Sequence, residues 1–348
     1  MKAKTLLSLI ALLLAMCPAA LPAAGVRTRI ALPPSEELYC IRFDSRGLLW
    51  MGTSAGLKSY DGYAVREEFA DLVQRFPQLG SDVRCLAADS AGNLWAGTND
   101  GLLRIALRTG QARLYRFPKS SQQVVYALFC ASDGALYAGT DDGFSLYRRE
   151  DDRFVHFNVE TAAALWPDGR RGRYEGWGVK DFAELLGGDI LVGTWGQGLW
   201  RYSPAGRTIR AYARLNRMNS AFALCPDRQG RLWIGTQGCG MQCLGRWDDC
   251  RLASLRTIDL GPQAGADAVV NDVVQTPDGQ VRACTGDTVA ACTGPDGALW
   301  MGTRGGGIVR LQEEDDLFTD YFLGAPVGSI YTGDGRYFYL GLGTQGLA

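Results

Sequence analysis

Histidine is almost absent from this chain, which has one, His156, among its 348 residues. That scarcity excludes most histidine-based catalytic schemes, and the GxSxG, HExxH and Walker patterns are missing too. His156 lies in DRFVHFN, a pattern typical of an outer strand. Paired acids such as Asp141 and Asp142 fall in predicted turns, where acidic residues are common. The sequence therefore predicts a protein that is not an enzyme and has no cofactor.

An excess of charge of either sign is also lacking. The chain has 36 Lys and Arg against 37 Asp and Glu, which gives a net charge of −1. No basic stripe is visible, so nucleic-acid binding is not expected. Beyond the first two dozen residues no apolar run approaches eighteen residues, and we expect no transmembrane segment in the mature chain.

The cysteines lack the spacing of a metal site. The chain has 10 cysteines but no CxxC pair, which makes a zinc site improbable. Four of them lie in apolar runs and are predicted to be small buried hydrophobic residues: Cys40, Cys85, Cys130 and Cys225. A cross-strand disulfide is the better interpretation for Cys243 with Cys250.

The amino terminus has the pattern of a secretory signal. Lys2 and Lys4 precede the apolar run Leu6–Met16, and small residues follow over Ala19–Ala24. We therefore expect a signal peptide over residues 1–24 and a periplasmic mature chain. The stretch that ends at Cys17 loosely resembles a lipoprotein box, so lipid anchoring at Cys17 is the alternative.

One short phrase recurs along the rest of the chain. DSRGLLWMGT ends at Thr53, DSAGNLWAGT at Thr98, and later copies end near Thr140, Thr194, Thr236, Thr303 and Thr344. Seven copies argue for a structural unit, because an active site needs one constellation only. In each copy a short apolar run, a glycine turn, a second strand, another tight turn and two further strands fit about 42 residues. Four strands in a meander form one blade of a β-propeller.

The sequence thus predicts an all-β propeller over 25–348 with about seven four-stranded blades, the last of them incomplete. The aromatic of the phrase should be buried between neighbouring blades, at Trp50, Trp95, Trp233 and Trp300. Its glycine should let adjacent backbones approach, and its threonine should satisfy turn amides. The spacing fails between Gly235 and Gly302, where DGQVRACTGD is a partial copy. We expect residues 267–292 to be the least regular part of the ring, either an inserted hairpin or a blade without outer strands.

DSRGLLWMGTSAGLKSYDGY, Asp44 to Tyr63, resembles the two-component-regulator propeller repeat, and six later copies are similar. The resemblance implies the periplasmic sensor of a hybrid two-component system, which typically detects glycan fragments. In that family two propellers precede a β-sandwich, a membrane helix, a kinase and a response regulator. This sequence has one propeller and none of the others, so we expect a truncated product. Arg27–Leu32 is predicted to supply an outer strand to the last blade. The alternative function is an exported protein-interaction module or a non-signalling remnant.

Departures from the repeat gather on one predicted face. The Gly-Thr turns and the connectors between blades share that face, and there flat aromatics and arginines suit the rings and acidic groups of sugars. The candidate ligand-binding residues are Trp166, Arg171, Arg173, Tyr174, Trp177, Trp195, Gln197 and Arg304. For the connector that holds Trp166 to Trp177, a solvated loop that caps a blade is the alternative. Possible partners are an oligosaccharide, another protein or a second copy of the chain. No metal ligands are predicted.

Overall fold

The computed structural model describes residues 26–68, 72, 75–76, 82–157, 178–185, 187–213, 220–237, 240–244, 256–258, 269–277, 279–286, 288–304, 307–311, 329–331 and 339–341. Two compact units divide the chain, Met1–Gln312 and Glu313–Ala348. The second contains one described antiparallel hairpin, β27 (Ser329–Tyr331) with β28 (Tyr339–Gly341). Within the described ranges no helix has the length and hydropathy that a membrane crossing requires.

The first unit is built from antiparallel meanders, each named here after its first strand. The β2 blade consists of β2 (Leu38–Phe43), β3 (Leu49–Thr53), β4 (Gly56–Tyr60) and β5 (Val65–Glu67). The β6 blade consists of β6 (Val83–Ala88), β7 (Asn93–Thr98), β8 (Gly101–Ala106) and β9 (Gln111–Tyr115). The β10 blade consists of β10 (Val125–Cys130), β11 (Leu136–Thr140), β12 (Gly143–Arg148) and β13 (Arg153–Phe157).

Two further blades repeat that order. The β14 blade consists of β14 (Val179–Glu184), β15 (Ile190–Thr194), β16 (Leu199–Ser203) and β17 (Thr208–Ala213). The β18 blade consists of β18 (Ala221–Pro226), β19 (Leu232–Thr236), β20 (Met241–Leu244) and β21 (Arg256–Ile258).

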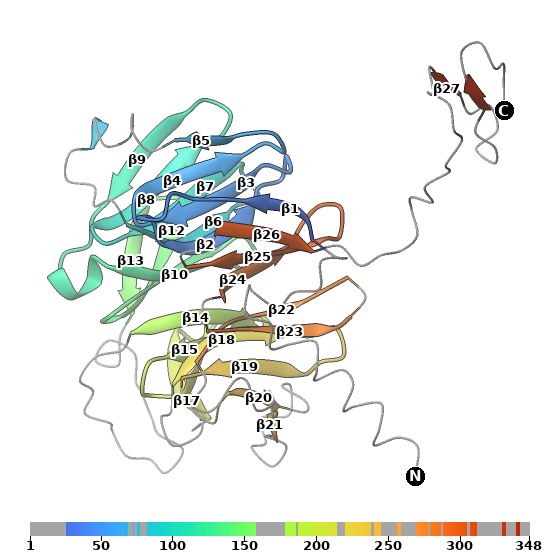
Figure 1. Cartoon of the computed structure of the whole chain (residues 1–348). Coiled ribbons are helices and arrows are strands. Elements are labelled where there is room, and N and C mark those ends of the chain that lie inside the picture. Colours follow the sequence, from blue (N-terminus) through green and yellow to red (C-terminus); the bar gives the residue numbers. More distant parts are fainter. Residues whose placement is uncertain are drawn as a thin grey trace, which may run out of the picture. The chain divides into compact units, whose positions relative to one another are not determined.

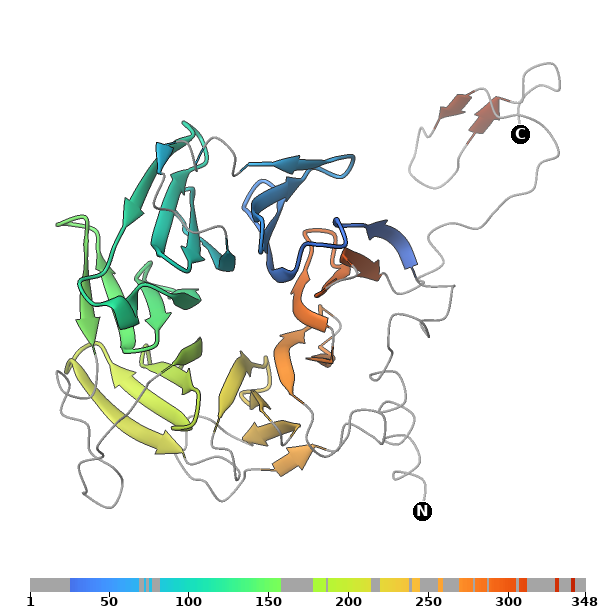
Figure 2. The ribbon, with the colours of Figure 1, turned by 60° about the vertical axis from the view of Figure 1, so that its left-hand side comes forward.

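The remaining two sheets close the ring. The described part of the β22 blade has two strands, β22 (Val270–Gln275) and β23 (Val281–Thr285). The β24 blade joins β24 (Thr288–Thr293), β25 (Leu299–Thr303) and β26 (Gly307–Leu311) to the amino-terminal β1 (Val26–Ile30). Each first strand packs against the next around the axis, and β24 packs against β2 (Figure 2). In Figure 1 β1 runs beside β26, with Ile30 paired to Ile308.

The predicted propeller is confirmed, with six four-stranded sheets and one two-stranded sheet in the described ring. The last blade was predicted to be incomplete, but the blade with two described strands is the β22 blade. It lies inside the region that was predicted to be the least regular. The degenerate copy between Val270 and Thr285 supplies a first strand of its own, so the ring is complete before the final copy of the phrase begins. The predicted amino-terminal outer strand forms, and it completes the β24 blade.

Aspartate and tryptophan recur together in the phrase because the two side chains are hydrogen-bonded to each other. Asp44 accepts the Trp50 indole N–H (3.1 Å) and the backbone N–H groups of Arg46 (2.8 Å) and Leu48 (3.1 Å). Asp89 accepts from Trp95 in the same way, at 2.8 Å. These hydrogen bonds hold the pKa of both carboxyl groups below its usual value, although burial alone would raise it.

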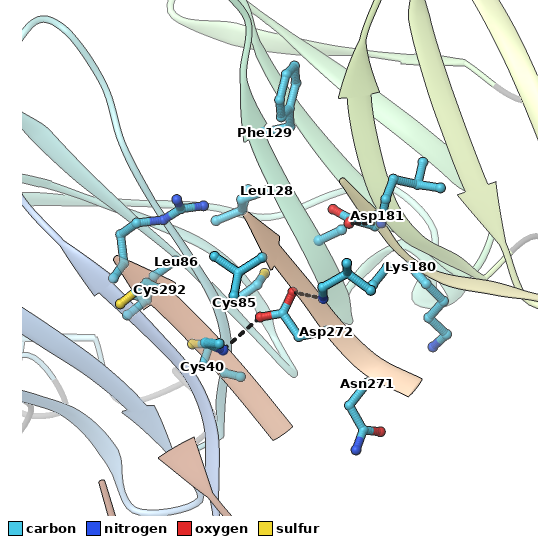
Figure 3. Close-up of a pocket in the computed structure, with 18 of the residues that line it drawn as sticks. Cys40, Cys85, Leu86, Leu128, Phe129, Lys180, Asp181, Asn271, Asp272 and Cys292 are labelled. Carbon is cyan, nitrogen blue, oxygen red and sulfur yellow. Dashed lines mark hydrogen bonds between the residues drawn. The ribbon is translucent and has the colours of Figure 1, made fainter. Parts of the chain in front are cut away.

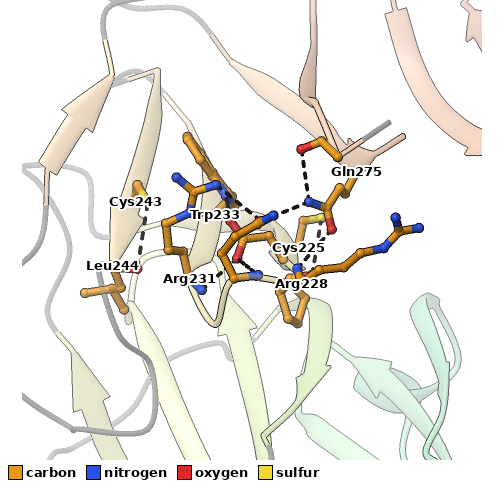
Figure 4. A network of polar contacts seen from close by, with 11 residues as sticks. Cys225, Arg228, Arg231, Trp233, Cys243, Leu244 and Gln275 are labelled. Atoms are coloured by element: carbon orange, nitrogen blue, oxygen red, sulfur yellow. Dashed lines mark hydrogen bonds and ion pairs between the residues drawn. The ribbon is translucent and has the colours of Figure 1, made fainter. Parts of the chain in front are cut away.

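The β18 blade carries a third copy of this pair, shown in Figure 4. Asp227 accepts a hydrogen bond from the Trp233 indole N–H (2.8 Å) and forms an ion pair with Arg231. The neighbouring turn also reaches the two-stranded blade, because Arg228 N–H donates to the Gln275 side chain (3.0 Å). Asp227 therefore shapes the turn and satisfies the indole, while Arg228 beside it connects the turn to the next blade.

The glycine and threonine of the phrase serve the packing that the sequence predicted. A Cβ added to Gly139 would lie 2.7 Å from Val179 Cγ1, on the first strand of the next blade. Thr98 is fully buried, and its hydroxyl donates to the Gly101 carbonyl (3.0 Å) and accepts the Asp100 N–H (3.1 Å). Three of the four tryptophans predicted to be buried are so, namely Trp50, Trp95 and Trp300. The fourth, Trp233, is partly buried.

Candidate functional site

A channel of about 630 Å³ lies on the axis of the ring, and all seven first strands line it (Figure 3). Each first strand has a register shift after its first residue, as between Leu38 and Cys40 in β2. The second residue of the strand falls in this bulge and therefore leaves the regular alternation of side chains. The seven second residues all line the channel, and they are Tyr39, Arg84, Tyr126, Lys180, Phe222, Asn271 and Val289.

Because the first strands all run the same way, these second residues share one end of the channel, called the mouth here. The turn between the second and third strands of each blade lies at the same end, since the second strand is antiparallel to the first. Trp195, in the turn after β15, is thereby brought to Lys180. The mouth is the face that the sequence predicted for ligands.

Aromatic rings and cations alternate across four neighbouring blades at the mouth. The guanidinium carbon of Arg84 lies 5.1 Å from the ring centre of Tyr39 and 6.0 Å from that of Tyr126. Lys180 Nζ lies 3.5 Å from the ring centre of Tyr126 and 5.2 Å from that of Trp195. Each contact is within the range of a cation–π attraction. We call this set of five side chains the cation–aromatic ladder.

Two carboxylates fix the ladder from the side. Asp82 accepts the Tyr39 hydroxyl (3.4 Å) and pairs with Arg84 (3.1 Å). Asp141 accepts the Tyr126 hydroxyl at 3.0 Å. Burial, followed by the charge of Asp141, raises the pKa of Tyr126 to about 12, so its hydroxyl stays a hydrogen-bond donor.

Lys180 differs from Arg84 in having no such partner. Its ammonium makes neither a hydrogen bond nor an ion pair to another described residue, and it lies instead over the rings of Tyr126 and Trp195. Burial lowers the pKa of Lys180 to about 8, against the opposing attraction of the Asp141 carboxylate. The mouth therefore holds a partly buried cation whose charge nothing in the described ring pairs directly.

Deeper in the channel wall, two blades carry a carboxylate at the third position of the first strand (Figure 3). Asp181 accepts the N–H groups of Phe182 (2.8 Å) and of Leu224 (2.7 Å) in the neighbouring β18 blade. Asp272 repeats this arrangement with Val273 and with Ala291 of the β24 blade, each at 2.8 Å. Both carboxylates thus link adjacent blades.

Burial sets the titration of these two carboxylates. It raises the pKa of Asp181 to about 7 and that of Asp272 to about 6, while the accepted N–H groups act in the opposite direction. Arg42, a channel-lining residue of β2, lowers both pKa values through its charge. These groups support the wall, and their oxygens are occupied by backbone donors.

The structure places three of the eight residues predicted for ligand binding. Trp195 is 54% exposed and belongs to the ladder. Gln197 lies in the same turn, where its carbonyl accepts the Trp200 indole N–H (3.1 Å). Arg304 is exposed after β25, and its carbonyl accepts the Leu38 N–H (3.1 Å). The other five lie outside the described residues, and they are Trp166, Arg171, Arg173, Tyr174 and Trp177.

Sequence reasoning missed four ladder residues, Tyr39, Arg84, Tyr126 and Lys180. The signal was present, since aligning the copies leaves one column before the phrase that changes from aromatic to cationic to amide, while the residue before it is apolar in six of the seven copies. Cys250 lies outside the described residues, so its pairing with Cys243 stays a prediction.

Comparisons with known proteins agree with this architecture. The family model described as "two component regulator propeller" matches residues 77–100 and 217–238. No curated protein sequence matches the chain. The fold is similar to the extracellular domain of BT4673 from B. thetaiotaomicron, described both as a one component and as a hybrid two component system (TM-score 0.67, 17% identity). That match covers 91% of this chain and 44% of the other.

Two more solved structures show the same fold. The extracellular domain of BT3049 from B. thetaiotaomicron matches with TM-score 0.63 and 18% identity, over 92% of this chain and 46% of the other. Virginiamycin B lyase from Staphylococcus aureus matches with TM-score 0.62 and 12% identity, over 82% of this chain and 98% of the other. The chain thus spans less than half the length of the two extracellular domains it matches, and these identities establish the fold alone.

Proposed function

We propose that this chain, whose blades carry the two-component regulator propeller repeat, is a periplasmic ligand-binding sensor propeller that takes an oligosaccharide at its channel mouth and catalyses no reaction on it. The observation that carries the proposal is the cation–aromatic ladder. It sets Trp195, half exposed, beside a cluster of aromatic and charged side chains on rigid strands. Such an apolar surface with few placed polar groups is typical of a small-ligand site.

The chemistry of the ladder suits a sugar. The exposed ring of Trp195 offers an apolar surface to the C–H face of a pyranose. Asp82, Asn99 and Asp141 place acceptors around the ladder, and Arg84 and Lys180 place donors, which match the hydroxyl groups of a saccharide. The strands hold these groups before binding, so little ordering entropy is lost.

Titration calorimetry with neutral and acidic oligosaccharides tests the proposal. Trp195→Ala should weaken binding about tenfold, roughly 1.4 kcal/mol, because it removes the exposed stacking surface. The matched control is Tyr63→Ala, since Tyr63 is 95% exposed in the turn between β4 and β5 and does not line the channel. Equal losses in the two variants would remove the mouth from consideration.

A second readout addresses catalysis. The mixture of protein and oligosaccharide is incubated and examined by mass spectrometry. We expect the saccharide to be recovered unchanged, because Asp82 and Asp141, the two carboxylates beside the ladder, each already accept a tyrosine hydroxyl. A cleavage product that Trp195→Ala abolishes would contradict the non-enzymatic proposal.

A further inference from the structure

The unpaired ammonium of Lys180 has a direct energetic consequence. A charge that is partly removed from water costs free energy unless an opposite charge or hydrogen bonds replace the lost solvent. The two aromatic rings at 3.5 and 5.2 Å recover only part of that cost. The depressed pKa of Lys180, about 8, shows that burial outweighs the attraction of Asp141.

The groups around Lys180 come from three neighbouring blades. Tyr126 belongs to the β10 blade, and Asp141 lies in the turn between β11 and β12 of the same blade. Trp195 faces Lys180 from its own β14 blade. Arg84, in the β6 blade, is already paired with Asp82, and its charge lowers the pKa of Lys180 further. One cation of the ladder is therefore neutralised and the other is not.

We infer that the ligand of the mouth carries an oxyanion, a carboxylate or a sulfate on its sugar ring, which pairs with the Lys180 ammonium while the ring lies against Trp195. This inference rests on the proposed function and names its ligand class. Of the two cations in the ladder, Arg84 already pairs with Asp82, which leaves Lys180 to take the oxyanion.

The pairing predicts a proton-coupled binding reaction. An oxyanion near Nζ favours the charged lysine and raises its pKa. Free protein at pH 8 holds Lys180 about half protonated, since its pKa is about 8. Binding then draws about half a proton per ligand from the buffer at that pH. A carboxylate or sulfate on a sugar is fully ionised there and contributes no proton of its own.

The experiment is calorimetry of the full chain at pH 8 in two buffers with different ionisation enthalpies. The probes are an oligogalacturonate, a sulfated oligosaccharide and a neutral oligosaccharide of matched length. We expect one acidic probe to bind at least tenfold more tightly than the neutral one, with uptake of about half a proton. Lys180→Met should remove both the preference and the uptake. Lys180→Arg should keep the preference and lose the uptake.

The matched control is Lys119→Met. Lys119 is a lysine already paired with Asp142 (3.2 Å), so its loss changes the net charge but not the proton uptake. Two results would overturn the inference and leave the proposed function standing. One is a neutral probe that binds as tightly as the acidic probes and depends on Trp195. The other is an acidic probe that binds without proton uptake. Failure of all three probes to bind would overturn both. Inorganic sulfate binding as tightly as the sulfated sugar would show a small-anion site instead.

Discussion

The two halves of the channel mouth have the same backbone and opposite surfaces. In the β2, β6, β10 and β14 blades the second residue of the first strand is tyrosine, arginine, tyrosine and lysine. In the β18, β22 and β24 blades the same position holds Phe222, Asn271 and Val289. The bulge that exposes this position is present in all seven first strands, so the backbone does not cause the difference.

The comparison shows where a repeat protein is free to vary. The first residue of each strand packs between blades, as fully buried Leu38 and Val270 do. The phrase that follows is held by packing and by its capping aspartate. The second residue contacts mainly the channel, so a change there costs little stability and alters only the surface of the mouth. Chemical variety can therefore collect at this position, and in this chain the tyrosines and cations collect on one side.

The largest effect should come from breaking the ladder at its centre. Tyr126 contacts both cations, so Tyr126→Ala should weaken oligosaccharide binding about 100-fold, ~2.7 kcal/mol, in a calorimetric titration. Phe222→Ala makes the matched change on the other half and should alter the affinity by less than about threefold. Similar losses in both variants would show that the two halves bind together.

Each half of the ring contains one channel-wall aspartate with a raised pKa, and the stability of the protein should therefore depend on pH. The free energy of unfolding should fall as pH rises from about 4 to about 7, because folded Asp181 and Asp272, with pKa values of about 7 and about 6, hold protons that the unfolded chain releases near 3.8. Both groups are ionised above that range, and the slope ends. Urea unfolding at pH 5 and at pH 7.5 measures it.

The control for this slope is the double variant Asp181→Asn, Asp272→Asn. His156, whose pKa burial lowers, contributes a slope of opposite sign below about pH 6.5. The informative quantity is therefore the difference between the native chain and the double variant. Asp181→Asn and Asp272→Asn, which lie in different halves of the ring, should each remove part of that difference. Parallel pH profiles for the native chain and the double variant would contradict this interpretation.

The smallest effect we expect is a difference in stability between variants of two buried tryptophans, Trp95 and Trp300. Trp95 donates its indole N–H to Asp89, whereas the Trp300 indole nitrogen has no hydrogen-bond partner among the described residues, since Gly294 stands where the aspartate should be. Trp95→Phe removes one of the hydrogen bonds that the partly buried Asp89 carboxylate accepts, so it should destabilise the protein by about 1 kcal/mol more than Trp300→Phe does. Thermal unfolding followed by circular dichroism measures the difference. A larger loss at Trp300 would show that packing outweighs this hydrogen bond.

The sequence predicted the framework because the framework repeats. Copies of one phrase reveal burial, turns and glycine contacts by their agreement, as with Trp95 and Gly139. The ladder could not be read in the same way, because a site is made of positions that disagree between copies. Trp195 was found since it interrupts a familiar turn. Lys180 was missed because the varying column before the phrase does not by itself show that this residue falls in a bulge and faces the channel.

The same reasoning accounts for the error about the last blade. Counting copies by their Gly-Thr pair left DGQVRACTGD, which has Cys284-Thr285, outside the seven full copies, although Cys284 is buried opposite Asp272 as the glycines are opposite their partners. A larger side chain fits there, and the spacing to the next copy leaves no room for two more strands before β24 begins at Thr288.

The pairing of β1 with β26 makes assembly of the ring a late and cooperative event. Val26 pairs with Leu311, so the first described strand has its sheet partner only when nearly the whole ring has been synthesised. Contacts this distant in sequence carry a large loop-closure entropy and slow folding. Until closure, the edge of β26 is open to pairing with other strands. The exposed edge of β26 is therefore where a partly folded chain is open to aggregation, until β1 pairs with it.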